Sequence, residues 1–278
     1  MRIPHFPRVS VFLGLFLAAL VLAGCATTPN YLFVDGPRYA GAYAQSAPQN
    51  DEGFQVVTWN IQYSRHVDAA IHLLKTAPEL QNLDVLLLQE MDEEGVDRMA
   101  RALHLNYVYY PASIHIRHKH DFGEAILSPW PLIDDGKLIL PHYSPRNGQI
   151  RIAVRAWVQT PDQPVLVYNT HTETSLMTPA QRLDQVRALL ADVDADASPV
   201  IIGGDFNTIT PWEQRVLVEN MGEAGFAWVT VEAGPTVTEM GAGVTMDYIF
   251  ARGMDLAAAG VIPDAEVSDH LPLWVELR

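Results

Sequence analysis

The stretch VIIGGDFN, residues 200–207, ends an apolar run on two glycines, an acid and an amide. Its first part is typical of a buried strand, because β-branched residues pack well on a pleated surface. Asp205 and Asn207 lie two residues apart, so an extended chain places both on one face. Carboxylate and amide oxygens can hold a hard cation or orient water. A plain turn uses the same residue types, so the interpretation depends on how other strands end.

Polar residues of the same kinds recur beside other apolar segments. Each of these segments is short and nearly continuous, as expected for a buried strand. The residues at or beside their ends are Asn60, Glu90, His171, Asp247, Asp269 and His270. With Asp205 and Asn207 these residues form six clusters, which are too many to be independent turns. We therefore predict that these side chains converge, with Asp205 and Asn207, on one site.

Helical patterns alternate with the apolar segments. Residues 67–74, 93–103 and 178–191 have helical periodicity, and Thr178-Pro179 is a cap followed by a proline in the first turn. Apolar strands interleaved with helices imply sheets covered on both faces, and hence an α/β layered domain. Ligands bind such domains where strand ends meet loops. The converging polar residues are expected at that edge.

Together, and in this order, the motifs resemble the endonuclease/exonuclease/phosphatase superfamily, which includes deoxyribonuclease I, apurinic endonucleases, neutral sphingomyelinases and inositol polyphosphate phosphatases. The resemblance implies that residues 53–278 form a catalytic domain that cleaves a phosphoester with the help of a metal. It implies an α/β fold, a four-layered sandwich with two packed mixed β-sheets. The matching motifs are Trp59-Asn60, Gln89-Glu90, Gly123-Glu124-Ala125-Ile126-Leu127-Ser128, Asn169-Thr170-His171, Gly204-Asp205-Phe206-Asn207, Met246-Asp247-Tyr248-Ile249 and Ser268-Asp269-His270-Leu271-Pro272.

The same resemblance implies a divalent cation, Mg²⁺ or alternatively Mn²⁺. Glu90 would be its principal ligand, with Asn60 beside it and Asp269 at the metal side of the site. Mg²⁺ favours oxygen ligands and takes only one or two carboxylates, which agrees with this set.

Catalytic roles follow from the resemblance as well. Asp205 would orient or deprotonate the attacking water, and Asn207 would hold the water and the phosphate. His270 would contact the phosphoryl oxygens as a cation, with Asp247 as its partner, because a carboxylate beside a histidine raises its pKa. His171 would be a second phosphate donor.

The N-terminus resembles the export signal of a bacterial lipoprotein. Arg2 and Arg8 precede an apolar run that is too short to span a bilayer comfortably. The run ends on Leu22-Ala23-Gly24-Cys25, which is similar to a lipobox, and Cys25 is the only cysteine of the chain.

We therefore expect three regions along the chain. Residues 1–24 would be a signal peptide, residues 25–52 a lipidated cysteine and a tether with little fixed structure, and the remainder the catalytic domain. Cys25 would carry the lipid and anchor the protein to the bacterial cell envelope. Ala26 after the cysteine favours the outer membrane if the cell is Gram-negative.

Charge bears on the substrate. The net charge is −15, from 33 acidic residues against 18 lysines and arginines. This charge disfavours nucleic-acid binding as the main function, because such binding depends on neutralising phosphates with basic residues. Glu124 replaces an asparagine of many family nucleases, and Pro129-Trp130 replaces a basic residue, so both changes remove contacts to a polyanion. Arg117-His118-Lys119-His120 is either a solvated loop or a local basic cleft. A phospholipid headgroup or a small organic phosphate is favoured over nucleic acid.

Other functions stay open or are disfavoured. The alternatives are a nuclease acting on DNA or RNA, and an inactive surface-binding lipoprotein, which would be expected to lose a metal carboxylate or the final Asp-His pair. A zinc site at His115, His118 and His120 is disfavoured without nearby cysteines. No protein partner is implied. Three tryptophans are expected in the core: Trp130, Trp212 and Trp228.

Overall fold

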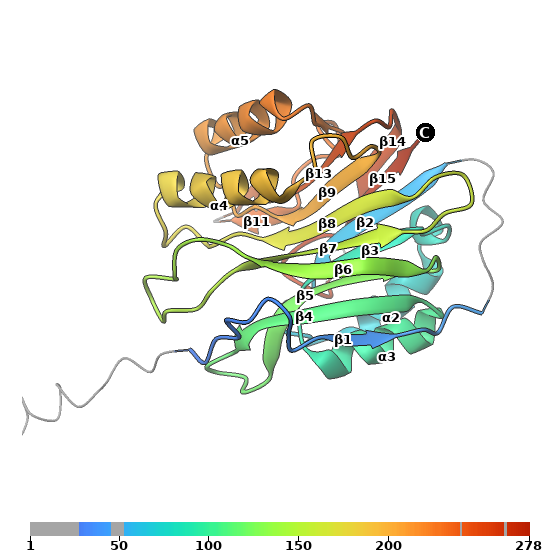
Figure 1. Ribbon diagram of the computed structural model, residues 1–278, viewed down its shortest axis with the longest axis horizontal. Helices are drawn as coiled ribbons and strands as arrows, with labels where there is room; N and C mark the ends of the chain where they lie inside the picture. Colours follow the sequence, from blue (N-terminus) through green and yellow to red (C-terminus); the bar gives the residue numbers. More distant parts are fainter. Residues whose placement is uncertain (1–27, 46–52, 240, 264–265) are drawn as a thin grey trace, which may run out of the picture.

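The computed structural model describes residues 28–45, 53–239, 241–263 and 266–278. Within these ranges two mixed β-sheets pack face to face, and helices cover the outer face of each sheet (Figure 1). The predicted four-layered α/β sandwich is therefore confirmed. The predicted signal peptide and Cys25 lie outside the described residues. Among the helices of the described ranges, none has the length and apolar composition needed to cross a membrane.

The first sheet has seven strands in the order β1-β4-β5-β3-β2-β15-β14. Only the central neighbours β2 and β3 run parallel, and the other pairs are antiparallel. The strands are β1 (Tyr39–Gly41), β2 (Phe54–Asn60), β3 (Val85–Met91), β4 (Asn106–Ile114), β5 (Asp121–Ser128), β14 (Leu256–Val261) and β15 (Leu273–Leu277).

The second sheet repeats this plan with six strands in the order β10-β13-β9-β8-β7-β6. Its single parallel pair is β8 and β9. The strands are β6 (Leu132–Ile139), β7 (Ile152–Val158), β8 (Val165–His171), β9 (Val200–Asp205), β10 (Ala227–Trp228) and β13 (Asp247–Arg252), and a separate small hairpin is formed by β11 (Val237–Glu239) and β12 (Ala242–Val244).

The helices flank the two sheets. In α4, the Thr178 hydroxyl accepts from the backbone N–H of Gln181, whose side chain reaches back to the cap, so the predicted start is confirmed. The pattern of residues 211–223 gave no helix prediction, and its deeply buried apolar residues are only Leu217 and Met221. The helices are α2 (Val67–Thr76), η1 (Pro78–Leu80), α3 (Glu93–Leu103), α4 (Pro179–Asp192) and α5 (Pro211–Glu223).

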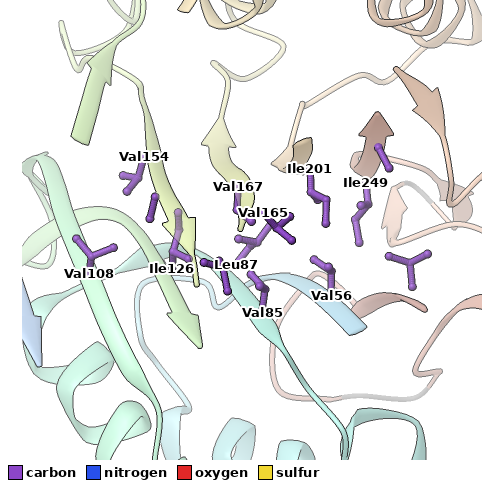
Figure 2. Close-up of a cluster of buried hydrophobic side chains, with 14 of the residues drawn as sticks. Val56, Val85, Leu87, Val108, Ile126, Val154, Val165, Val167, Ile201 and Ile249 are labelled. Atoms are coloured by element: carbon purple, nitrogen blue, oxygen red, sulfur yellow. The ribbon is translucent and has the colours of Figure 1, made fainter. Parts of the chain in front are cut away.

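The core between the sheets explains why the strands are apolar on both faces. In β3, Val85 and Leu87 point into the cluster between the sheets (Figure 2), whereas Leu86 and Leu88 pack toward α2 and α3. Burying each such side chain stabilises the fold by about 1.5–3 kcal/mol. Strand β3 therefore has no solvent face, and its polar residues, Gln89 and Glu90, come only after the apolar run.

The two parallel pairs bring the polar strand ends together. His171 at the end of β8 pairs with Asp205 at the end of β9, and Asp205 pairs in turn with Asp247 at the start of antiparallel β13. In the other sheet, Asn60 pairs with Gln89, directly before Glu90. All of these positions lie at the same edge of their sheets.

Two glycines let β9 reach this edge. A Cβ atom on Gly203 would lie 2.6 Å from Leu87 Cδ1 of the facing sheet. A Cβ atom on Gly204, whose φ is +141°, would collide with the carbonyl oxygen of Thr170 on β8. The glycines before Asp205 are therefore required by close packing on two sides.

The N-terminal segment differs from the prediction. Residues 28–45 pack on the domain, and β1 adds an edge strand to β4. Arg38 forms two hydrogen bonds of 2.6 Å to Asp135, and Lys137 donates to the carbonyl oxygens of Tyr31 and Gly36 at 3.2 and 2.9 Å. The prediction of a tether with little fixed structure is wrong for this segment, because its partners are far away in sequence.

Candidate active site

Asp205 lies at the centre of the polar cluster and is 1% exposed. Its Oδ2 accepts a hydrogen bond from Asn60 Nδ2 at 3.1 Å and lies 3.4 Å from His171 Nε2 and 3.7 Å from His270 Nε2. Its Oδ1 accepts from the backbone N–H of Asn207 at 2.9 Å. Burial raises the pKa of Asp205 above its usual range, while the nearby His270 opposes the rise. A carboxylate in this state is suited to accept a proton from water.

His270, just before β15, is paired with Asp247. The two are joined by a 2.8 Å hydrogen bond between Nδ1 and Asp247 Oδ2. Burial disfavours the protonated ring, but the charges of Asp247 and Asp205 outweigh this effect and raise the pKa of His270 to about 10. The backbone carbonyl of His270 also accepts from Trp59 Nε1 at 2.9 Å. The raised pKa favours the protonated ring of His270 at neutral pH.

Glu90 forms a separate acidic side of the site. It has a φ of 59°, in the left-handed region, where the register of β3 against β5 shifts. Its half-buried carboxylate accepts no hydrogen bond from any residue in the described ranges. Burial raises the pKa of Glu90 to about 7, Arg151 and His270 oppose this rise, and Asp205 and Asp269 add to it. Glu90 is thus an oxygen donor that forms no direct ion pair within the described ranges, although the charges of Arg151 and His270 act on it.

Gln62 links the other two predicted metal residues. Its backbone N–H donates to Asn60 Oδ1 at 3.0 Å, and its side chain donates to Asp269 Oδ2 at 2.8 Å. The Ser268 hydroxyl donates to the Asn60 carbonyl at 2.7 Å, which ties the loop of Asp269 to the end of β2. Asn60 and Asp269 are far apart in sequence, but the Gln62 bridge and the Ser268 hydrogen bond hold them on one side of the site.

Sequence reasoning missed Arg151 and Glu173. Both are buried, and they form an ion pair with a 3.3 Å separation between Arg151 Nη2 and Glu173 Oε1. Arg151 Nη1 also lies 3.1 Å from each ring nitrogen of His171. Burial, together with the charges of Arg151 and His270, holds the pKa of His171 well below its usual range. His171 is therefore a neutral ring, and the only sequence signal for Arg151 was a charge directly before an apolar run.

Glu124 lies inside the cluster, beside His171. It is 1% exposed, and its Oε1 is 3.9 Å from His171 Nδ1. Its Oε2 has no hydrogen-bond partner within the described part of the chain. Burial raises the pKa of Glu124 well above its usual range, which favours the uncharged acid. At the position where many family nucleases have an asparagine, this chain therefore has an acid, Glu124, that favours its uncharged form.

The tryptophans divide between core and surface. Trp130 is buried and its Nε1 donates to Asp84 Oδ1 at 2.8 Å, so it belongs to the core as expected. Trp228 is half-buried. Trp212, in the first turn of α5, is 55% exposed, and the core prediction is wrong for this residue.

The ligand atoms of His115, His118 and His120 do not form a group within 4.8 Å of one another. In the described ranges, the one group of three side chains whose ligand atoms lie within 4.8 Å of one another is Asp205, Asp247 and His270. His115 Nδ1 instead accepts from the backbone N–H of His118 at 3.3 Å.

The model of the Endonuclease/Exonuclease/phosphatase family matches residues 57–270 of this chain. The chain belongs to this family. Family members are phosphoester hydrolases that depend on a divalent metal. The matched stretch begins in β2 and ends at His270, so it contains every predicted catalytic and metal residue: Asn60, Glu90, His171, Asp205, Asn207, Asp247, Asp269 and His270.

Among curated proteins, this chain is similar to a UPF0294 protein from Vibrio cholerae, with 29% identity over 116 residues. The match covers 42% of this chain and 41% of the relative, so the chain spans less than half the length of that protein.

Several solved structures share the fold at low sequence identity. An endonuclease/exonuclease/phosphatase from Beutenbergia cavernae has 23% identity and a TM-score of 0.64, over 81% of this chain and 71% of that one. TDP2 from D. rerio, complexed with single strand DNA product, has 19% identity and a TM-score of 0.63, over 82% and 100%. ANGEL2, a 2′,3′-cyclic phosphatase in complex with adenosine-2′,3′-vanadate, has 17% identity and a TM-score of 0.61, over 87% and 98%.

The oxygen donors of this family member fit a divalent metal. Glu90 has a carboxylate without a hydrogen-bond partner in the described ranges, and two further acids, Asp205 and Asp269, act on it electrostatically. A hard cation would stabilise the charged form of Glu90, which burial and the charges of Asp205 and Asp269 disfavour. The donors available beside it are oxygens, which is the ligand type that Mg²⁺ and Mn²⁺ accept.

Replacing Arg151 by methionine is expected to destabilise the fold by about 3 kcal/mol, because Glu173 would remain buried without its cation. Urea denaturation measures this loss. Adding Glu173→Gln to Arg151→Met should recover most of the stability, since no uncompensated charge is left. If Arg151→Met alone is as stable as the unchanged protein, the pair has no structural role.

Proposed function

We propose that this chain is a phosphoesterase that uses Mg²⁺, or alternatively Mn²⁺, to hydrolyse a phosphodiester or phosphomonoester by attack of water. The observation that carries the proposal is the environment of Asp205. This buried carboxylate lies between the Asn60 amide, the neutral His171 and the cationic His270. It combines an acceptor for the proton of water with donors for a phosphoryl group in one enclosed place.

Glu90, with Asn60 and Asp269, would hold the metal. When bound there, the cation would polarise a phosphoryl oxygen and neutralise the charge that develops on it. The group of Asp205, Asp247 and His270 is a weaker candidate for the metal, because a protonated histidine is no ligand. Its two carboxylates are already compensated by His270.

The remaining side chains handle the water and the phosphate. Asp205 orients the attacking water and accepts its proton, and the Asn207 N–H keeps that carboxylate in place. Asn207 is also assigned to holding the water and the phosphate. His270 donates from Nε2 to a phosphoryl oxygen while Asp247 holds Nδ1. His171, as a neutral ring, donates one N–H to the same group.

A phospholipid headgroup or a small organic phosphate is the favoured substrate class. The net charge of −15 slows the approach of a long polyanion. Nucleic acid is the second candidate, because TDP2 was solved with a single strand DNA product. An inactive binding lipoprotein is the third, and the retention of every predicted metal and catalytic residue speaks against it.

Hydrolysis assays test the proposal. The purified chain would be offered nucleic acids, phospholipids and small phosphoesters, each with Mg²⁺, with Mn²⁺ and with a chelator. We expect hydrolysis of at least one phosphoester, with loss of activity in chelator and recovery when Mg²⁺ is added back. Undiminished activity in chelator would exclude the metal mechanism, and no turnover in any condition would favour the inactive alternative.

We also propose that the enzyme is tethered to the cell envelope through Cys25. The support is the lipobox-like Leu22-Ala23-Gly24-Cys25 and the absence of any other cysteine. A tether of this kind would hold the catalytic domain near a membrane surface, which suits a lipid substrate and does not require one. The outer membrane is the expected location in a Gram-negative cell.

Cys25→Ser is expected to leave the protein unprocessed or released from membranes, because the lipid is attached to the cysteine sulfur. Membrane fractionation and the mass of the mature protein measure both effects. Ser46→Ala, outside the signal, serves as the control. A Cys25→Ser protein that still fractionates with membranes at mature length would show that the lipobox interpretation is wrong.

A further inference from the structure

A hollow of about 410 Å³ adjoins the candidate active site. Its walls come from the loop after β2, the loop between β4 and β5, the loop between β6 and β7 and the segment after β8. Arg151 lines it and also contacts His171 of the active site. Tyr63 lines it too, and lies close enough to Glu90 for that charge to act on its hydroxyl. The hollow therefore opens directly beside the residues assigned to the reaction.

The charge of this hollow is opposite to that of the chain. Four arginines line it, Arg65, Arg117, Arg146 and Arg151, against a single carboxylate, Glu173. Glu173 is already paired with Arg151, and both are buried. The other three guanidinium groups remain without a carboxylate partner among the residues that the structure describes.

The unpaired arginines are unusual in so acidic a chain. Most of the other arginines in the described ranges pair with a carboxylate, as Arg38 does with Asp135 and Arg155 does with Asp192. Arg117 and Arg146 form neither an ion pair nor a hydrogen bond with any residue in the described ranges. Three segments far apart in sequence thus bring unpaired cations to one place, which is what an anion site requires.

The wall between these arginines is made of aromatic rings. Tyr63, His115 and His118 contact one another pairwise, with ring centroids 4.6, 4.6 and 4.7 Å apart. Burial lowers the pKa of His115 to about 4 and also lowers that of His118, so both rings are neutral at pH 7. The positive charge of the hollow therefore belongs to the arginines, and the rings form a packed support for them.

The loop of residues 117–120, for which the sequence allows either a solvated loop or a local basic cleft, contributes only some of its residues to the hollow. Arg117 and His118 line the hollow, whereas Lys119 and His120 do not. Of the two interpretations of residues 117–120, the local basic cleft is therefore favoured for Arg117, and His118 lines the same cleft as a neutral ring.

We propose that this hollow binds a second phosphate group of the substrate, so that the preferred substrate is a small phosphoester carrying a further phosphate. The inference rests on the proposed function for the identity of the reacting group. Guanidinium groups match phosphate oxygens in a two-point geometry. The volume is in the range of small-molecule sites, which are about 300–1,000 Å³, and it favours a compact ligand over a long strand.

Binding without turnover tests the hollow itself. Titration calorimetry of the full chain in chelator would compare inorganic pyrophosphate with orthophosphate as probes. We expect pyrophosphate to bind at least tenfold more tightly, and Arg117→Gln with Arg146→Gln to weaken its binding at least tenfold. Arg215→Gln is the matched control, because Arg215 is exposed on α5 and has no carboxylate partner in the described ranges. Unchanged affinity in the double variant, or no binding to the unchanged protein, would overturn the proposal.

Kinetics then test the link to the substrate. Two matched pairs would be compared with Mg²⁺: a sugar bisphosphate with its monophosphate, and a dinucleotide with and without a terminal phosphate. We expect kcat/KM to favour the doubly phosphorylated member of at least one pair at least tenfold, and the double variant to remove that preference. The preferred pair distinguishes a sugar phosphate from a nucleotide. Equal rates within both pairs, or rates that climb steadily with oligonucleotide length, would refute a compact second-phosphate site.

The two proposals can fail separately. If no phosphoester is hydrolysed but pyrophosphate binding depends on Arg117 and Arg146, the proposed function fails and the anion site stands. If hydrolysis occurs without any preference for a second phosphate and without pyrophosphate binding, the proposed function stands and the inference fails. Circular dichroism and thermal melting of the double variant verify that it remains folded, as expected for two exposed side chains.

Discussion

Glu90→Gln is expected to lower kcat/KM by at least about two powers of ten, or about 3 kcal/mol of transition-state stabilisation. Glutamine keeps the size of the side chain but removes the charge that a metal ligand supplies. It is also as compatible as glutamate with the left-handed backbone at this position. The fold should therefore survive while metal binding and turnover are lost.

Three measurements separate this effect from unfolding. Circular dichroism and the melting temperature of the variant should stay close to those of the unchanged protein, since the Glu90 carboxylate makes no hydrogen bond within the described part of the chain. Titration calorimetry with Mg²⁺ should show weaker binding. Glu94→Gln, an exposed glutamate of α3, should leave the activity in place. Full activity of Glu90→Gln would contradict the assignment of Glu90 to the metal.

His270→Ala is expected to lower kcat by about three powers of ten, or about 4 kcal/mol, and Asp247→Asn should add little to this loss. Asp247 acts on the phosphate only through the imidazole ring, so the two residues form a unit whose effects are not additive. A double-mutant cycle on the best substrate measures the coupling. Losses that add within about 0.5 kcal/mol would mean that the two residues act independently.

The pH dependence supplies a second test of the same pair. His270 donates to a phosphoryl oxygen only while protonated, so its contribution is complete at low pH and is lost as the pH rises through its pKa. Asp247 is the strongest of the charges that raise this pKa to about 10. Asp247→Asn should therefore lower the pKa and move the basic limb of the pH–rate profile to lower pH. If Asp247 were only a structural strand residue that accepts hydrogen bonds from backbone amides, its loss would reduce thermal stability. The basic limb of the pH–rate profile would then stay where it was.

Local patterns in the sequence were sufficient for the α/β class and for the polar residues at the strand ends, whereas the four layers and the two packed sheets were predicted from the family resemblance. Val85 to Leu88 are apolar without interruption because both faces of the strand are buried, and this requirement is visible in the sequence itself. The start of α4 follows from a capping box between Thr178 and Gln181, which involves only neighbouring residues. Such signals are local because they arise from strand pleating and helix ends.

The roles of individual side chains at the site came from the resemblance and from their place at strand ends. The register of β8, β9 and β13 then brings His171, Asp205 and Asp247 side by side, as the convergence of polar ends predicts. Their order along the chain does not reveal these neighbours without the sheet topology. The end of β9 meets the start of β13 only because the antiparallel strand β13 lies beside the parallel pair of β8 and β9.

Only the tertiary structure decided the electrostatic state of the site. Burial, together with the charges of Arg151 and His270, holds the pKa of His171 well below its usual range, and the buried ion pair of Arg151 with Glu173 joins residues that no local pattern pairs. The packing of residues 28–45 and the gathering of unpaired arginines at the hollow were equally hidden. In each case the decisive contacts join residues far apart in sequence, and the burial that shifts a pKa or leaves a charge unpaired exists only once the layers have packed.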